Sequence, residues 1–286
     1  MDVFFQMRFA YCGKPDGILT RKKPNAGAVL DDTQILREFE LLERVTLPSL
    51  AAQIDPSFQL LVLSSARMPE DGKEHLTWLL NHYLPGRARA IFARPMVPGR
   101  VFRRHMQGLG RGDVPVIQTQ ILKGDAFSPT FVQRLREHGI ENWTANPRSR
   151  AEKAASGTFM SFRRGWTLGM RHKSFTGLEQ ARAPIKPFAL SLVARPSSRY
   201  TPMLINPDLL GVKFPHVSVM SEKIHCLRVL RGPKATDMPA VEKKLLTQAE
   251  ADFGFLAQGH KIPVVEDQVI ATPRDMSEVV PLRRAG

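Results

Sequence analysis

The residues best suited to chemistry follow short apolar segments in the first half of the chain. Arg8 and Phe9 end one such segment, Ser64 and Ser65 end the next, and Arg94 follows a third. An arginine suits a phosphate, an aromatic ring suits a nucleobase, and small hydroxyl residues leave room for a ligand. In parallel α/β sheets, ligands bind beyond the carboxyl ends of the strands. These side chains therefore indicate a nucleotide site if the segments are neighbouring strands.

Each of these residues also has a structural interpretation. Phe9 fits the hydrophobic core better than a nucleobase site, and Arg94 fits the rim of a sheet. For Arg8, phosphate binding and a plain surface position are equally compatible with the sequence. The crevice that we predict is lined by Ser64, Ser65, Arg94 and Asp125.

Apolar runs and helical spacing predict the elements that carry these residues. Four strands are expected, at Val3–Phe9, Phe58–Leu63, Arg89–Phe92 and Val114–Gln118. Helices are expected at Leu36–Gln53 with a kink at Pro48, Glu74–Leu84, Phe102–Leu109, and Ser128–His138 with Ser128 as N-cap. The alternation of strand and helix predicts an α/β fold with a mostly parallel central sheet.

The second half of the chain has a less regular pattern. Thr158–Phe162 and Trp166–Met170 are predicted to pair as a hairpin around a turn at Arg163–Gly165. Phe188–Val193 is predicted to be a further strand, and Val241–Phe255 is the one stretch after Gly232 with helical spacing.

An excess of positive charge is the unusual feature of the composition. Lys and Arg number 41 against 27 Asp and Glu, which gives a net charge of +14 and an isoelectric point near 10.2. Such an excess favours anionic partners, among them nucleotide diphosphates, acidic glycans, acidic lipid surfaces and nucleic acid. No aromatic RNA-binding motif, zinc-finger spacing or recognition helix is evident, so nucleic acid is not the partner that we expect.

Cysteine content and hydropathy point to the cytoplasm. Cys12 and Cys226 lie far apart and outside any metal-binding spacing, as expected of a reduced cytoplasmic chain without a zinc site. No apolar run reaches the roughly 18 residues that a membrane span requires. The first residues have an acid at Asp2 and no basic lead-in, so we interpret them as a buried strand rather than a signal peptide.

Two segments resemble a known family. Phe39–Ser65 (FELLERVTLPSLAAQIDPSFQLLVLSS) and Gln118–Leu135 (QTQILKGDAFSPTFVQRL) are similar to segments of the rhamnosyltransferase family of bacterial GT-A-type glycosyltransferases. The resemblance implies a GT-A-like nucleotide-diphospho-sugar transferase fold, with helices on both faces of the sheet. It implies a transferase domain at residues 1–232 and a helical or irregular appendage at residues 233–286.

The family has an aspartate cluster within the second segment, and this chain departs from it. Such carboxylates hold Mg²⁺ or Mn²⁺ against the donor's diphosphate. Here Leu122, Lys123 and Gly124 occupy the first three aspartate positions, and Asp125 alone remains. One carboxylate is a poor metal site, so no firm metal cofactor is expected. Lys123 is either a phosphate-stabilising ammonium in place of the metal or a solvated loop residue beside an inactive site.

A third segment resembles the acceptor side of the family's site. It is Ser221–Gly232 (SEKIHCLRVLRG), where the family's aromatic position is Cys226 and its late histidine position is Arg231. An inverting transfer needs a carboxylate to deprotonate the acceptor hydroxyl, and Glu222 is the candidate base. The competing interpretation is an exposed loop glutamate.

The resemblance therefore implies a rhamnosyl or hexosyl transferase with an altered metal site, using a nucleotide-sugar donor. The implied acceptor is a cell-surface polysaccharide or glycan precursor, and the implied location is the cytoplasm, with peripheral contact to the anionic inner membrane as a further prediction. Two alternatives stay open: a non-catalytic relative that binds a nucleotide, a glycan or a partner protein, and a basic protein associated with nucleic acid.

Overall fold

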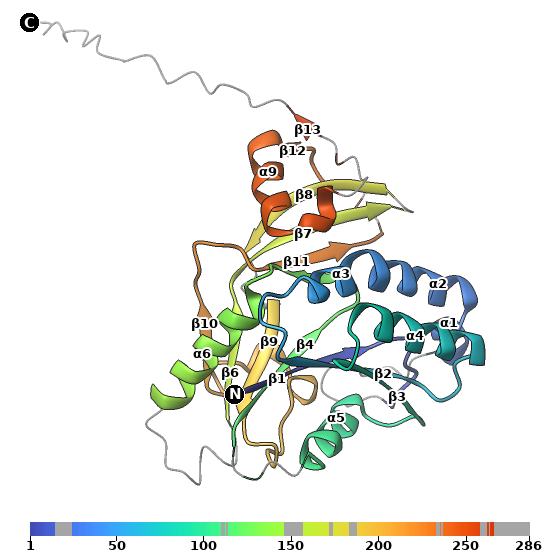
Figure 1. Cartoon of the computed structure of the whole chain (residues 1–286), viewed down its shortest axis with the longest axis vertical. Coiled ribbons are helices and arrows are strands. Elements are labelled where there is room, and N and C mark those ends of the chain that lie inside the picture. The colour runs from blue at the N-terminus through green and yellow to red at the C-terminus, as the bar shows by residue number, and fades with distance from the viewer. Residues whose placement is uncertain are drawn as a thin grey trace, which may run out of the picture.

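The central sheet has an order that brings the first four predicted strands together (Figure 1). The computed structural model describes residues 1–14, 25–109, 112, 114–145, 157–171, 174–182, 188–232, 235, 237–257, 262 and 264–265. Within these residues the sheet has seven strands in the order β10-β6-β9-β4-β1-β2-β3. Their bounds are β1 Asp2–Arg8, β2 Phe58–Ser65, β3 Ala88–Ala93, β4 Val116–Ile121, β6 Thr158–Phe162, β9 Phe188–Ala194 and β10 His216–Val219.

The parallel half of this sheet confirms the prediction for the N-terminal half. β1 pairs in parallel with β2 and β4, and β2 pairs in parallel with β3. β9 then runs antiparallel to both β4 and β6, and β10 pairs in parallel with β6. The mixed second half was not predicted, because strand direction depends on long connections that leave no local pattern in the sequence.

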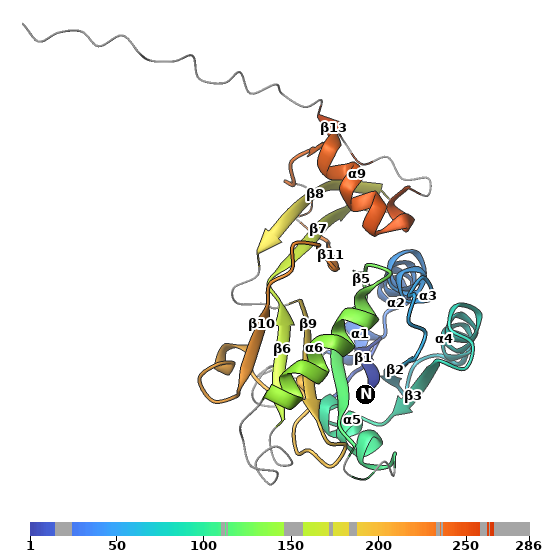
Figure 2. The same cartoon turned by 60° about the vertical axis from the view of Figure 1, so that its left-hand side comes forward.

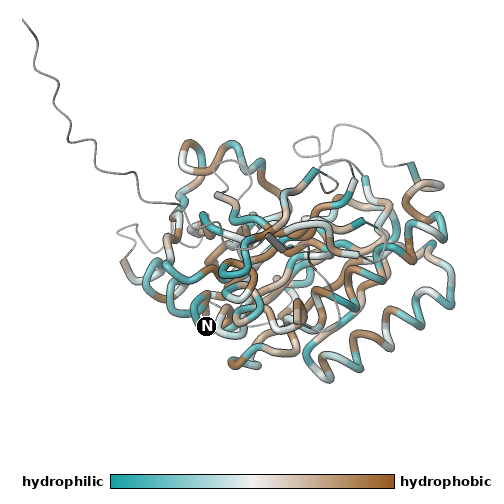
Figure 3. Tube along the Cα trace, turned by 90° about the horizontal axis from the view of Figure 1, so that it is seen from above, coloured by the Kyte–Doolittle hydropathy of each residue, from teal (hydrophilic) through white to brown (hydrophobic). Residues whose placement is uncertain are grey.

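Helices cover both faces of the sheet, as the α/β interpretation requires. Four helices lie against one face: α2 (Asp32–Leu41), α3 (Leu47–Ala51), α4 (Glu70–Tyr83) and α6 (Phe131–Ala145). The opposite face is covered by α5 (Pro98–Gln107) and the short helix η2 (Pro202–Leu204). Hydrophilic and hydrophobic residues are interleaved along the helices (Figure 3), as expected of elements with one buried stripe.

The helix before β2 differs in form from the prediction. α2 begins at Asp32, capped by the Asp31 side chain, which accepts a hydrogen bond from the Gln34 N–H. A π-helical turn, Leu42–Thr46, then separates α2 from α3. The helix was predicted to kink at Pro48, which has no N–H to donate. The irregularity is instead the π turn, which ends two residues before Pro48.

Ser128 does not cap α6, which corrects that prediction. Its hydroxyl instead shares a hydrogen bond with His225 Nδ1 at 2.8 Å. The buried Gln53 side chain takes the capping role: its Oε1 accepts from the Val132 N–H, and its Nε2 donates to the Ser128 carbonyl. A capping partner so far away in the sequence carries no local signal.

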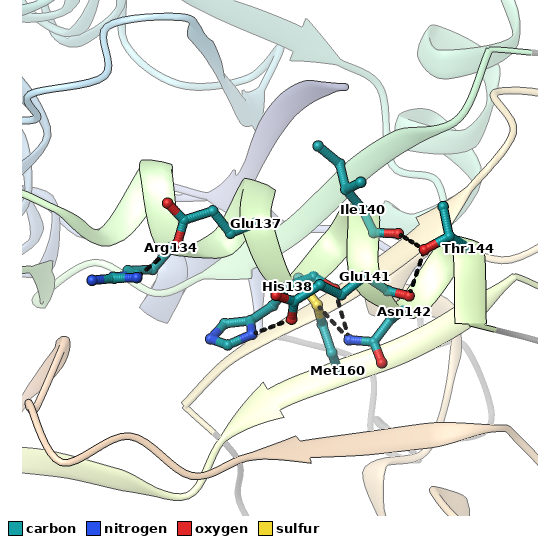
Figure 4. A network of polar contacts seen from close by, with 8 residues as sticks. All are labelled: Arg134, Glu137, His138, Ile140, Glu141, Asn142, Thr144 and Met160. Carbon is teal, nitrogen blue, oxygen red and sulfur yellow. Dashed lines mark hydrogen bonds and ion pairs between the residues drawn. The ribbon is translucent and has the colours of Figure 1, made fainter.

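The solvent side of α6 is held by its own polar contacts (Figure 4). Arg134 pairs with Glu137, and His138 pairs with Glu141, each three residues apart. On the side that faces the sheet, Asn142 reaches the buried Met160 Sδ on β6 at 4.0 Å. The Arg134–Glu137 and His138–Glu141 contacts fix the helix locally and leave its opposite side to pack on the sheet.

A second sheet lies beside the central one (Figure 2), and it overturns the predicted hairpin. β7 (Arg164–Arg171) does not pair with β6; it pairs with β8 (Ser174–Arg182) and β11 (Cys226–Leu230), and β11 pairs with β5 (Asp125–Phe127). Arg163 is therefore the link between two sheets rather than part of a hairpin turn.

The C-terminal part of the described chain covers this second sheet. α9 (Lys243–Asp252) is shorter than the predicted helix, and its buried Ala249 shares a core with Trp166 and Leu168 of β7. The remaining short elements are α1 Ala26–Val29, η3 Pro207–Leu209, η4 Gly254–Ala257, β12 Val241–Glu242 and β13 Val264–Val265. The domain boundary at residue 232 stays a prediction.

The predicted fold class is confirmed: the molecule is an α/β protein with a large, mostly parallel central sheet and helices on both faces. Among the helices that the structure describes, none is both long and apolar enough to cross a membrane.

Candidate functional site

The carboxyl ends of β1, β2 and β3 meet at one sheet edge. Arg8 is opposite Leu63, and Ser65 is opposite Ala93, which directly precedes Arg94. Arg8 and Arg94 are exposed there. The sequence therefore placed these two arginines correctly at one edge; their binding of phosphate stays a prediction.

The serines and the phenylalanine at this edge are not accessible to a ligand. Ser64 and Ser65 are fully buried; Ser64 Oγ contacts Met68 Sδ, and Ser65 Oγ accepts from the Arg67 N–H. Phe9 is also buried, with its ring 4.7 Å from that of Phe39. The ligand-binding interpretation of Ser64 and Ser65 is corrected, because they are buried in and before the turn after β2. The core position favoured for Phe9 is confirmed, and its ligand-binding alternative is corrected.

The turn Leu122–Asp125, between β4 and β5, is closed by its own backbone. The Asp125 N–H donates to the Leu122 carbonyl at 2.9 Å, and Asp125 Oδ2 accepts from the Leu122 N–H at 2.9 Å. Gly124 has φ +87°, a conformation that favours glycine, and its N–H donates to Thr46 Oγ1. The backbone of this turn thus favours glycine at position 124, where the resemblance implies a carboxylate in the family.

Asp125 is committed to an ion pair inside the protein. Its Oδ1 lies 2.9 Å from Arg228 Nε and its Oδ2 lies 3.4 Å from Arg228 Nη2. The Asp125 side chain is 4% exposed and the Arg228 side chain 20%. Burial alone would lower the pKa of Arg228, but the Asp125 charge and hydrogen bonds outweigh it and raise that pKa. The guanidinium, which also lies 5.1 Å from the centre of the Phe188 ring, is therefore permanently charged.

Lys123 is likewise paired, with Glu38 of α2. The Lys123 ammonium forms an ion pair with Glu38 Oε1 and keeps a third of its side chain exposed, whereas Glu38 is buried. Glu38 Oε2 also accepts from the Ala10 N–H at 2.9 Å. Ala10 has φ +43°, which costs a non-glycine residue about 1–2 kcal/mol, and Glu38 helps to hold it there. The buried carboxylate thus links the end of β1 to the turn after β4.

The third predicted segment holds a buried histidine between two serines. His225 Nδ1 shares a hydrogen bond with Ser128, and its Nε2 lies 3.3 Å from Ser221 Oγ. Burial lowers the pKa of His225 to about 4, and the Lys223 ammonium acts in the same direction. His225 is therefore neutral at pH 7. Glu222, the candidate base, is exposed in the same loop, and its carbonyl accepts from Arg164.

These residues do not fit a divalent cation. Asp125 is the sole carboxylate of the turn, and Arg228 already occupies both of its oxygens. Within the described ranges, no three His, Cys, Asp or Glu side chains gather as a metal site would require. Mg²⁺ needs oxygen ligands in near-octahedral geometry, and two adjacent cations repel it. The ion pair with Arg228 therefore argues against Asp125 as a metal ligand.

Two residues of this cluster, Glu38 and Arg228, were missed from the sequence. Glu38 lies three residues after the buried Ile35 and four before the buried Leu42, so it is on the apolar face of its helix. Arg228 lies in the middle of the apolar strand CLRVL. A charged residue at a position that is predicted to be buried needs an opposite charge nearby, so the sequence pattern could have identified both residues as members of buried ion pairs.

The fold is similar to solved structures of S. aureus TarS. With residues 1–349 of TarS, the sequence identity is 10%, the TM-score is 0.44, and the match covers 80% of this chain and 60% of that one. With the UDP-GlcNAc complex of the same fragment, the identity is 10%, the TM-score is 0.43, and the coverages are 87% and 64%. The chain therefore spans less than two thirds of the TarS fragment.

No curated protein matches the chain. A family model does match, over residues 6–243, which is most of the sequence. This match confirms the resemblance drawn from Phe39–Ser65 and Gln118–Leu135. The chain belongs to the family described as "Putative rhamnosyl transferase".

Proposed function

We propose that the protein is a glycosyltransferase that moves a rhamnosyl or related hexosyl group from a nucleotide sugar to a cell-surface polysaccharide or glycan precursor. The observation that carries the proposal is the family match over residues 6–243. The donor would bind at the sheet edge that Arg8, Arg94 and the turn Leu122–Asp125 share. We propose that it binds without a divalent cation, because the Asp125–Arg228 pair leaves no carboxylate to hold one.

The chain's own residues would then supply the chemistry. The acceptor hydroxyl attacks the anomeric carbon, the bond from that carbon to the diphosphate breaks, and the hydroxyl proton passes to Glu222. Lys123 exchanges Glu38 for the leaving diphosphate and stabilises its negative charge. One ammonium has half the charge of Mg²⁺ and is less well oriented, so slow turnover is expected.

Calorimetry with UDP-, GDP- and dTDP-sugars, first in EDTA and then in Mn²⁺, tests the proposal. One nucleotide class should bind in EDTA, and Lys123→Ala should weaken that binding by about 1–3 kcal/mol, the scale of a charge-assisted hydrogen bond. Lys73→Ala is the control, because it also removes an ammonium from an ion pair, with the exposed Glu70 on α4, outside the turn Leu122–Asp125. Affinity that appears only with Mn²⁺, or an unchanged affinity in Lys123→Ala, would contradict the cation-free site.

A second candidate is a non-catalytic role in binding a nucleotide or glycan. The observation that favours it is that Lys123 and Asp125 are both paired within the chain, which leaves the turn electrically balanced. Release of free nucleotide from the donor in the presence of acceptor glycans separates the two candidates. Tight binding without any release would favour the non-catalytic one.

Peripheral contact with an anionic membrane remains part of the proposal. The net charge of +14 supports it, since basic surfaces are attracted to anionic lipids. Sedimentation with anionic vesicles at low and high salt tests it, and binding that is absent at low salt would exclude it.

A further inference from the structure

A cleft of about 680 Å³ lies between α2 with its π turn and α4, on the sheet face that α2, α3, α4 and α6 cover. Its lining includes Arg37, Phe39, Glu40, Glu43 and His75. This volume lies within the range of small-molecule sites, which are about 300–1,000 Å³. None of these lining residues belongs to the proposed donor site.

The charge of the lining sets the cleft apart from the rest of the protein. Two carboxylates, Glu40 and Glu43, face two guanidiniums, Arg37 and Arg44, so their formal charges cancel in a chain whose net charge is +14. An anionic ligand would gain little here compared with the basic surface elsewhere. Carboxylates accept and guanidiniums donate, so together they suit hydroxyl groups, each of which does both.

The carboxylates differ in how far they are committed. Glu40 is fixed by Arg44 at 2.9 Å and by Arg231 at 2.8 Å. Among the described residues, Glu43 has no hydrogen bond or ion pair, although it is half-buried and its charge contributes to the raised pKa of Tyr83. Glu40 is thus held in place by its two arginine partners, whereas the Glu43 carboxylate can accept a hydrogen bond from a ligand.

The rim of the cleft is apolar and aromatic. On α2, Leu36 belongs to the lining and is 67% exposed; on α4, the lining residue His75 begins a row of nearly parallel rings that continues outside the lining to Trp78, which is 55% exposed, and to His82. The His75 ring also meets Phe39 edge-on at 4.6 Å. A pyranose ring has both hydroxyl groups and apolar C–H faces, and the C–H faces pack on aromatic and aliphatic side chains. Such a ring therefore suits a pocket that is lined by polar and apolar side chains together.

We propose that this α2–α4 cleft binds a neutral saccharide. Glu43 accepts from its hydroxyls, Arg37 donates to them, and the His75–Trp78 row contacts a ring face. The inference concerns a site separate from the donor crevice and does not rest on turnover. The helix α2 nevertheless links the two, because Glu38 on the same helix holds Lys123.

Titration of the whole protein with neutral probes tests the proposal. The probes are L-rhamnose, maltotriose, mannotriose and galactobiose, and their binding is measured without nucleotide by calorimetry and by tryptophan fluorescence. At least one probe should bind saturably, and Glu43→Gln should weaken its binding about tenfold, the usual scale for a lost hydrogen bond to a charged group. Trp78→Ala should weaken it as well.

The matched control is Asp71→Asn, an exposed acid of α4 outside the cleft lining, which should leave affinity unchanged. Absence of binding by every probe would overturn the proposal, and so would equal affinity in Glu43→Gln. Displacement of the saccharide by UDP, GDP or dTDP would place it in the donor crevice instead. Vesicle binding that is lost on Leu36→Ser, with no saccharide binding, would show that the rim is a membrane contact.

Discussion

The Asp125→Asn substitution separates a structural aspartate from a metal ligand. It removes the charge opposite Arg228 but keeps an oxygen that can accept the Leu122 N–H. Breaking a buried ion pair by removing one partner costs about 3–5 kcal/mol, because the other charge is left without compensation. Arg228 keeps 20% of its side chain exposed and lies over the Phe188 ring, so we expect the lower end, about 3 kcal/mol.

Urea unfolding followed by circular dichroism and tryptophan fluorescence measures this loss. Trp166 is a suitable reporter because it is buried in β7 opposite Leu227, the neighbour of Arg228. The double variant Asp125→Asn with Arg228→Met removes both charges and should lose only about 1 kcal/mol, less than the single variant. Glu137→Gln, at the exposed pair with Arg134, is the control and should cost less than about 1 kcal/mol.

The opposite outcome would refute the structural interpretation of Asp125. If Asp125→Asn changed the unfolding free energy by less than about 0.5 kcal/mol, the ion pair would not stabilise the fold. If the same variant also abolished a Mn²⁺-dependent affinity for nucleotide sugars, Asp125 would be a metal ligand, and the pair with Arg228 would have to open on binding.

Two further predictions concern the surroundings of this turn. The pKa of His225 falls from about 6.5 unfolded to about 4 folded, so below pH 6.5 the unfolded chain binds a proton that the folded protein does not. The unfolding free energy should therefore drop by about 3 kcal/mol between pH 6.5 and 4. In a series of urea unfolding midpoints measured over this pH range, His225→Gln should reduce the slope. A slope equal to that of the unmodified protein would contradict the prediction. Gly124→Ala should destabilise by more than about 1 kcal/mol, since φ is +87° and the new Cβ would lie 3.2 Å from Val229 Cβ. At Gly86, φ is +70° and an added Cβ would have no atom within 4 Å, so Gly86→Ala measures the backbone contribution alone. If both variants lost the same stability in thermal unfolding, the contact with Val229 would contribute nothing at Gly124.

The parallel half of the fold could be predicted because its signals are local. Apolar runs such as Phe58–Leu63 and helical spacing such as that of Leu76, Leu79 and Leu80 appear within one element, and the structure places all three leucines in the core. The hairpin prediction failed for the opposite reason. Thr158–Phe162 and Trp166–Met170 are both true strands close in sequence, but the partners of each come from residues 174–230. Pairing across such distances is decided by the packing of two sheets rather than by the turn between two strands.

The same distinction explains what could be read at the site. The sequence located the turn Leu122–Asp125, and it gave Lys123 and Asp125 as candidate site residues there. It could not supply their partners, because Glu38 lies 85 positions from Lys123, and Arg228 lies 103 positions from Asp125. Those partners change the meaning of the two residues. Asp125 is bonded to the Leu122 N–H and to Arg228, so its place in the turn has a structural explanation that needs no metal. Lys123 is paired with a buried carboxylate, which under the proposed function it would exchange for a phosphate, so that the positive charge at the diphosphate would come from the chain itself.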